Sequence, residues 1–187
     1  GHLLLDQHLE LCEPSLGNLE RKQFEAFLDK SARLMGPTIF DQVQLRSRTG
    51  EEVHLSFIGL GLTSRQIVQA MSDRDSRWII DKIEAAVVLA REAGCSAIGL
   101  GGYTSIVTAN CLRIKTEGIR LTSGNSLTVG MGLEAINQAV GEMDIQLSNV
   151  SLAVVGAAGN IASTYALMMA DKVAELVLVV RDLASPK

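Results

Sequence analysis

The sequence predicts an α/β protein with two domains. Short apolar runs typical of strands alternate with helical patterns of apolar residues, and near the carboxyl end a glycine-containing turn joins such a strand to a helix. The composition of the 187 residues, 47% hydrophobic and 20% charged, is that of a globular chain with enough material for a core. We place the domain boundary near Asn149, which gives a first domain over 1–149, ending in a connector helix over 127–143, and a second over 150–187.

The first half of the chain predicts two helices and a β-hairpin. A helix is expected over 19–35, where apolar residues recur at helical spacing among charges. Residues 38–47 and 52–58 alternate apolar and polar around the turn residues 48–51, which is the pattern of a hairpin with one buried and one solvated face. A short helix over 63–71 follows.

A longer helix and a buried strand come next. The apolar stripe over 74–93 predicts a helix that Ser72 or Asp73 caps and that Gly94 ends. The short apolar run 96–100 fits a buried parallel strand.

Two polar stretches follow and suggest a ligand cleft. The strand 96–100 runs into two glycines and three hydroxyl side chains, and a second polar stretch over 122–126 precedes the connector helix. Open α/β sheets bind ligands at the carboxyl ends of their strands. The alternative is that each stretch is only a turn and a helix cap. The candidate cleft residues are Gly101, Gly102, Tyr103, Thr104, Ser105, Ser123, Gly124 and Asn125.

The second domain begins with a nucleotide-binding pattern. An apolar strand over 152–155 leads into a turn with the spacing GxxGxxA, then an apolar helix to Ala170 and a second strand over 175–180. Glycines at such a turn let backbone N–H groups approach a pyrophosphate at the positive end of the helix. This predicts the start of a Rossmann-type NAD(P)-binding domain, with cofactor contacts from Gly156, Ala157, Ala158, Gly159, Asn160 and Ile161.

The residue after the second strand indicates which cofactor is bound. NAD sites usually carry an acidic residue there, whereas an arginine can accept the 2′-phosphate of NADP. The residue here is Arg181, which favours NADPH. The alternative is a solvated charge at a strand end.

Charge and cysteine usage exclude several classes of protein. The net charge of −4 and the lack of a Lys/Arg cluster argue against nucleic acid as a partner. No apolar run reaches membrane-spanning length and no signal peptide is apparent, so we expect a cytoplasmic protein. Cys12, Cys95 and Cys111 lie far apart without matching histidines, which supports free thiols and neither disulfides nor a metal site.

The order of these motifs resembles a known family. Five stretches are similar, in order and spacing, to the cyanobacterial-type long-chain acyl-[acyl-carrier-protein] reductases: Thr49-Gly50 with Val53-His54, then 90–94, 96–106, 122–126 and 153–161. The similarity runs from about Thr38 to Asp182, and the LGGYTSI and TSGN stretches are its most specific parts.

The resemblance implies a reaction and a division of roles. It implies NADPH-dependent reduction of a fatty acyl thioester, carried by acyl-carrier protein or coenzyme A, to an aldehyde through an enzyme-bound cysteine thioester. In that family the nucleophilic cysteine lies beyond the second strand of the nucleotide domain, so no catalytic residue is assigned here. The cleft residues above are carried over as the acyl-binding side, and His54 is carried over as a weaker catalytic candidate.

The β-α-β pattern at the carboxyl end is only part of a nucleotide-binding sheet, which needs more parallel strands. We therefore expect a truncated domain, and a chain that is inactive by itself. An apolar strand edge over 176–180 predicts self-association into a homo-oligomer.

Two other functions are compatible with this pattern. One is an oxidoreductase of the shikimate or quinate dehydrogenase type, but the stretches 107–111 and 124–128 offer neither the Lys nor the Asp that this class needs. The other is a non-catalytic module that binds a nucleotide or docks inside a larger synthase.

Overall fold

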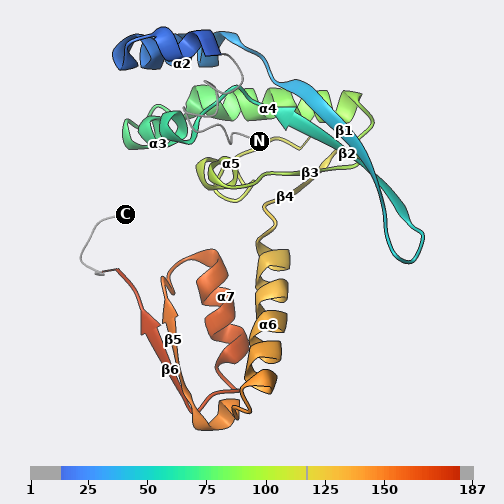
Figure 1. The fold of residues 1–187 in the computed structure, drawn as a ribbon, viewed down its shortest axis with the longest axis vertical. Coiled ribbons are helices and arrows are strands. Elements are labelled where there is room, and N and C mark those ends of the chain that lie inside the picture. Colours follow the sequence, from blue (N-terminus) through green and yellow to red (C-terminus); the bar gives the residue numbers. More distant parts are fainter. Residues whose placement is uncertain (1–13, 117, 182–187) are drawn as a thin grey trace. The chain divides into compact units, whose positions relative to one another are not determined.

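The computed structural model describes residues 14–116 and 118–181, and it confirms a mixed α/β chain (Figure 1). The chain divides into two compact units, 1–123 and 124–187. This division falls at the start of the connector helix, whereas the sequence placed the boundary near Asn149. The assignment of a substrate domain and a cofactor domain stays a prediction.

The first unit begins with a short 3-10 helix, η1 (Pro14–Asn18), and the amphipathic helix α2 (Arg21–Leu34). Phe24, Leu28 and Ala32 form the buried stripe of α2. The sequence pattern of this helix is therefore confirmed, with the ends shifted inward.

Strands β1 (Thr38–Arg46) and β2 (Glu52–Gly59) form the predicted antiparallel hairpin. Gly50 has φ +94° in its turn, a backbone conformation that glycine adopts at little cost. The expectation of one buried face is wrong, because Ile58 is the one buried residue of the two strands. The part of the hairpin toward its turn extends away from the helices (Figure 1).

Helix α3 (Ser64–Ser72) starts with a capping box, in which Thr63 Oγ1 accepts from the Gln66 amide and Gln66 Oε1 accepts from the Thr63 amide. Helix α4 (Arg77–Glu92) starts after Ser76. The predicted caps Ser72 and Asp73 are wrong because these residues end α3 instead.

The core of the first unit forms mainly around α4. Ile67, Ile79 and Ile83 are fully buried, and Ala86, Val87 and Ala90 continue the stripe. Gly94 ends the helix with φ +80°, as predicted.

Strand β3 (Ala97–Gly99) pairs in parallel with β4 (Arg120–Thr122), and the short helix α5 (Tyr103–Val107) lies between them in the chain. The sequence predicted β3 but neither α5 nor β4. Elements of three to five residues are too short to show a periodic pattern.

The second unit contains α6 (Asn125–Glu142), a 3-10 turn η2 (Leu147–Asn149), β5 (Ser151–Val155), α7 (Asn160–Met169) and β6 (Glu175–Val179). The β-α-β order is confirmed, since β5 and β6 pair in parallel. A small core of Val154, Ala157 and Ala166 joins α7 to one face of this sheet.

Helices α6 and α7 pack through a glycine and a tyrosine. Tyr165 Oη on α7 donates a 3.1 Å hydrogen bond to the Thr128 carbonyl of α6. A Cβ atom at Gly132 would overlap the Tyr165 hydroxyl, so this contact needs glycine.

The other face of the β5–β6 sheet is apolar and exposed. Val155, Val177 and Val179 lie on it, and β6 pairs with β5 alone among the described strands. Self-association through the edge at 176–180 stays a prediction. Within residues 14–116 and 118–181, no helix has the length and apolar character to cross a bilayer.

Candidate nucleotide-binding and substrate site

The turn between β5 and α7 is closed by its own backbone. Gly156 has φ +75°, and its amide and that of Ala157 donate to the Val179 carbonyl at 2.8 and 3.2 Å. The Gly159 amide donates to the Gly156 carbonyl at 2.8 Å. These bonds fix the turn across the carboxyl ends of both strands.

The amino end of α7 leaves donors available at this turn. The amides of Ala158, Asn160, Ile161 and Ala162 donate to no other group among the described residues, and Gly159, the N-cap, supplies no side chain. The first four amides of a helix have no partner within the helix and carry partial positive charge. The local geometry therefore suits a phosphate or pyrophosphate anion.

Gly159 keeps this approach open. A Cβ atom there would lie 3.3 Å from the Gly156 carbonyl oxygen, which is tight, and a larger side chain would occupy the space in front of the helix end.

Arg181 lies at the same edge of the sheet as the turn. It follows β6 by two residues, and Val179 of β6 accepts the bonds from Gly156 and Ala157. Its side chain is exposed and forms no ion pair with any residue in the described part of the chain. The turn between β5 and α7 and Arg181 after β6 therefore lie at the same edge of the sheet.

The structure also brings two parts of the candidate cleft together. The Leu100 amide donates to the Thr122 carbonyl at 2.8 Å, extending the parallel β3–β4 pair by one bond. Gly101 and Ser123 follow these two residues, so both lie at the carboxyl edge of this small sheet.

The hydroxyl groups of the LGGYTS stretch support the turn. Thr104 Oγ1 donates to the Gly101 carbonyl at 2.7 Å, and Ser105 Oγ donates to the Gly102 carbonyl at 2.8 Å. Both side chains are buried, whereas Tyr103 is 37% exposed. The local geometry of Thr104 and Ser105 is therefore that of a turn and a helix start, which was the alternative to a ligand cleft.

Gly124 and Asn125 belong to the second unit. Gly124 is the N-cap of α6 with φ +75°, and its carbonyl accepts from the Thr128 amide and hydroxyl at 3.0 and 3.1 Å. The candidate cleft residues are thus divided between the two units.

The remaining candidates lie apart from these turns. His54 is exposed on β2 opposite Gln44. Cys95 and Cys111 are half-buried free thiols that pack against the first core, and burial raises the pKa of Cys111, which disfavours the nucleophilic thiolate. Cys12 lies outside the described residues. Among the residues described, no three His, Cys, Asp or Glu side chains gather in a metal-binding group.

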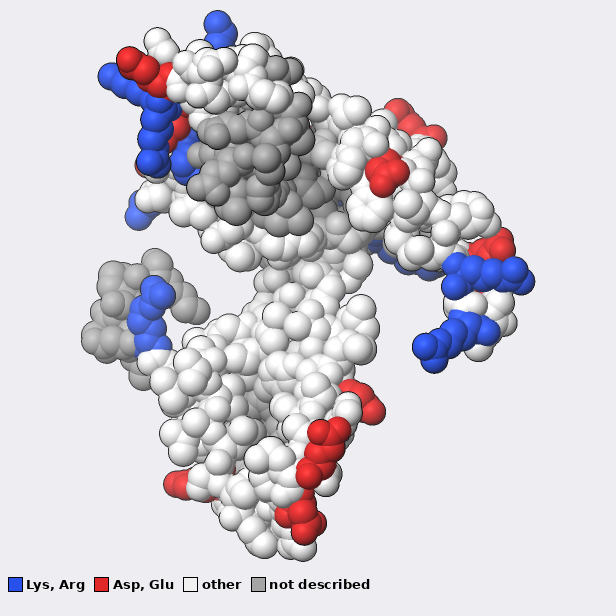
Figure 2. Space-filling view, viewed as in Figure 1, with Lys and Arg blue, Asp and Glu red and all other residues white. Residues whose placement is uncertain are grey.

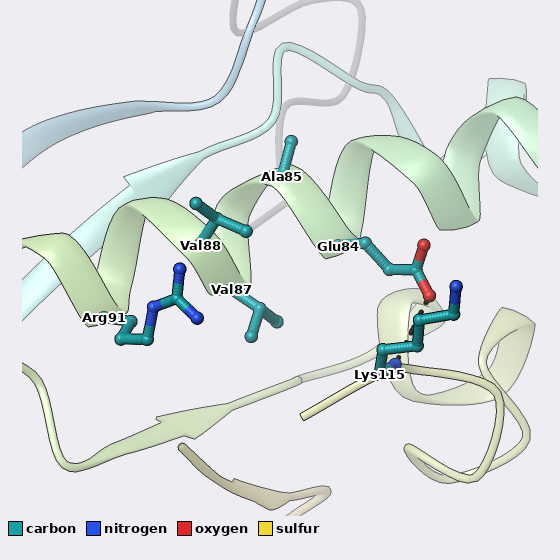
Figure 3. Close-up of a pocket in the computed structure, with 6 residues that line it drawn as sticks. All are labelled: Glu84, Ala85, Val87, Val88, Arg91 and Lys115. Atoms are coloured by element: carbon teal, nitrogen blue, oxygen red, sulfur yellow. Dashed lines mark hydrogen bonds between the residues drawn. The ribbon is translucent and has the colours of Figure 1, made fainter. Parts of the chain in front are cut away.

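Two cavities of the first unit were not predicted from the sequence. One of about 250 Å³ lies along α4, between Glu84, Val88 and Arg91 and the Lys115 segment, whose amide donates to Glu84 Oε1 (Figure 3). Another of about 200 Å³ lies beside Trp78. Neither contains a predicted site residue. Charged residues on the solvent-facing side of a helix such as α4 are common, so no feature of the sequence indicated a cavity.

The comparisons with known proteins give one similarity over nearly the whole chain. It is 26% identical over 188 aligned positions, or 94% of its length, to the long-chain acyl-[acyl-carrier-protein] reductase of Synechococcus elongatus, and spans 54% of that protein. A stretch of 88 residues is 35% identical to the aminotransferase PigE of a Serratia species and spans 10% of it. No family model matches the chain. The chain spans about half the length of the first relative and a tenth of the second.

Proposed function

We propose that this chain is the substrate half and the first nucleotide-binding unit of an NADPH-dependent oxidoreductase that reduces a fatty acyl thioester to an aldehyde. The observation that carries the proposal is the β5–turn–α7 geometry, with unbonded helix amides and Arg181 at one sheet edge, in a chain distantly similar to an acyl-[acyl-carrier-protein] reductase.

The residues at the turn fit the cofactor. The amides of Ala158, Asn160, Ile161 and Ala162 would hold the pyrophosphate, and Arg181 would bind the 2′-phosphate. When bound, NADPH supplies the hydride that the carbonyl carbon of the thioester receives. The aldehyde, a free thiol and NADP⁺ are then the products, with one proton taken up.

The LGGYTS and TSGN stretches are the proposed substrate-binding part of the chain. Tyr103 is exposed at the edge where Gly101 and Ser123 follow their strands, so we assign this edge to the acyl thioester. From the family resemblance, the thioester-forming cysteine is expected downstream of β6. Cys95 and Cys111 are both half-buried, and burial raises the pKa of Cys111, which disfavours its thiolate.

Turnover by the intact protein tests this function. With a long-chain acyl thioester of acyl-carrier protein or coenzyme A and NADPH, we expect aldehyde, thiol and NADP⁺ in equal amounts. An intact protein that binds NADPH but forms no aldehyde from either thioester would contradict the reductase.

One observation favours a second candidate, a non-catalytic module. An 88-residue stretch resembles a tenth of a much longer aminotransferase, so similar sequence occurs within a protein named for another activity. This candidate predicts cofactor or carrier binding without turnover, which the same experiment detects.

A further inference from the structure

The hairpin has one polar and one apolar face. Directly paired residues of an antiparallel ladder lie on the same face. On one face, Gln42 bonds Ser56 and Gln44 bonds Glu52. We call the other face the hairpin face, and it carries Asp41, Val43, Leu45, Val53, Leu55 and Phe57, with Phe40 from the bulge beside it.

The apolar side chains of the hairpin face are open to solvent. Phe40, Leu45, Val53, Leu55 and Phe57 are 40% to 68% exposed. Together they expose roughly 500 Å² of apolar surface, which is within the range of the largest patches that monomeric proteins carry, and such patches are often functional. An isolated two-stranded hairpin is also marginally stable in water, so a cover on this face would stabilise it.

The shape of the face favours a protein over a lipid chain. Neither of the two cavities described above is lined by hairpin residues, and the face consists of two extended strands. An acyl chain is held in a concave site that surrounds it. An extended face is suited to a second extended face.

Two residues of opposite charge, Asp41 and Arg48, lie toward opposite ends of the hairpin. Asp41 lies at the base, where its carboxylate accepts from the neighbouring Gln42 amide, and Arg48 lies in the turn. Neither forms an ion pair with a described residue. In Figure 2, uncharged side chains cover most of the hairpin and charged ones gather at its turn.

We propose that the hairpin face is an interface between two copies of this chain, packed antiparallel about a two-fold axis, with Asp41 of each copy beside Arg48 of the other. An isologous contact brings opposite ends of the same surface together, so the two reciprocal pairs follow from the symmetry. Two such faces bury about 1,000 Å² in total, which is the lower limit of a specific interface and fits a dimer of moderate affinity.

The first test is the oligomeric state of the intact protein, measured by sedimentation over a concentration series. We expect a monomer–dimer equilibrium that Leu45→Lys shifts to monomer and that the neighbouring Gln44→Lys, on the polar face, leaves in place. An intact protein that stays monomeric overturns the proposal. Association that Leu45→Lys leaves unchanged, as through the β6 edge, also overturns it.

The second test is charge reversal. Asp41→Arg and Arg48→Asp each place like charges together, so each variant alone should raise the dimer dissociation constant at least about tenfold. A mixture of the two variants should form the heterodimer, because each of its two reciprocal contacts again joins a basic side chain to an acidic one. Failure of the mixture to associate when the wild type dimerises contradicts the assigned register.

Discussion

Gly132 on α6 lies where Tyr165 of α7 packs against the helix. Its missing side chain makes room for Tyr165, whose hydroxyl reaches the Thr128 carbonyl. Nothing lies within 4 Å of a Cβ atom built on Gly130, two residues earlier in the same helix. The two glycines therefore serve as a matched pair.

Gly132→Ala should lower the free energy of unfolding by about 1–3 kcal/mol, because the added methyl group displaces Tyr165. Gly130→Ala should be neutral or stabilising by up to about 1 kcal/mol, since alanine favours the helix. Urea denaturation measures both. Equal effects of the two substitutions would contradict the packing described for α6 and α7.

Lys82 is a buried cation in the first core. Its ammonium donates to the Met35 carbonyl at the end of α2, and burial lowers its pKa from the ordinary value of 10.5. The unfolded chain then binds more protons than the folded chain at pH values between the lowered pKa and 10.5. The free energy of unfolding should therefore rise with pH in this range.

Lys82→Met removes the titrating group. The stability of the wild type relative to Lys82→Met should increase as the pH rises from neutral toward 10.5. Denaturation of both proteins at several pH values measures this difference. A difference that stays constant over the range would show that burial does not perturb Lys82.

The turn before α7 carries the main prediction for a single element. Gly159→Val should weaken NADPH binding at least about tenfold, because the side chain fills the space in front of the helix amides. Fluorescence titration of NADPH measures the affinity, with Gly130→Ala as the control in the same unit. Unchanged affinity of Gly159→Val in a folded protein would contradict a pyrophosphate site at this turn.

Long periodic elements were predictable from the sequence. In each of them, a pattern within the segment itself predicts the secondary structure. Examples are the apolar stripe of α4, the alternation of the hairpin strands and the strand–glycine–helix pattern of the second unit. The β-α-β unit and Gly50 and Gly94 with positive φ follow directly from these patterns.

Features that depend on tertiary contacts were not predictable. Strand β4 is three residues long and exists through pairing with β3, and the exposure of the hairpin depends on which elements reach it. The same applies to the candidate site. The hydroxyls of Thr104 and Ser105 were expected in a cleft, but each bonds a carbonyl three residues earlier.

At the scale of the whole molecule, the two units differ in their cores. The first has an extensive core around Ile67, Ile79 and Ile83, whereas the second buries few residues and exposes one complete face of its sheet. An apolar sheet face in an α/β protein is normally covered by further helices. The turn between β5 and α7 is held by one backbone bond within the turn and two to Val179 of β6, so its geometry depends little on what covers that face.

The most direct test is a calorimetric titration of the intact protein and its Arg181→Ala variant with NADPH and NADH. We expect the wild type to bind NADPH more tightly, and Arg181→Ala to lose about 10-fold to 100-fold in NADPH affinity while NADH binding is unchanged, because a charge-assisted phosphate contact contributes about 1.5–3 kcal/mol. Equal loss for both cofactors, or no binding of either by the intact protein, would contradict the assignment of an NADPH-dependent reductase.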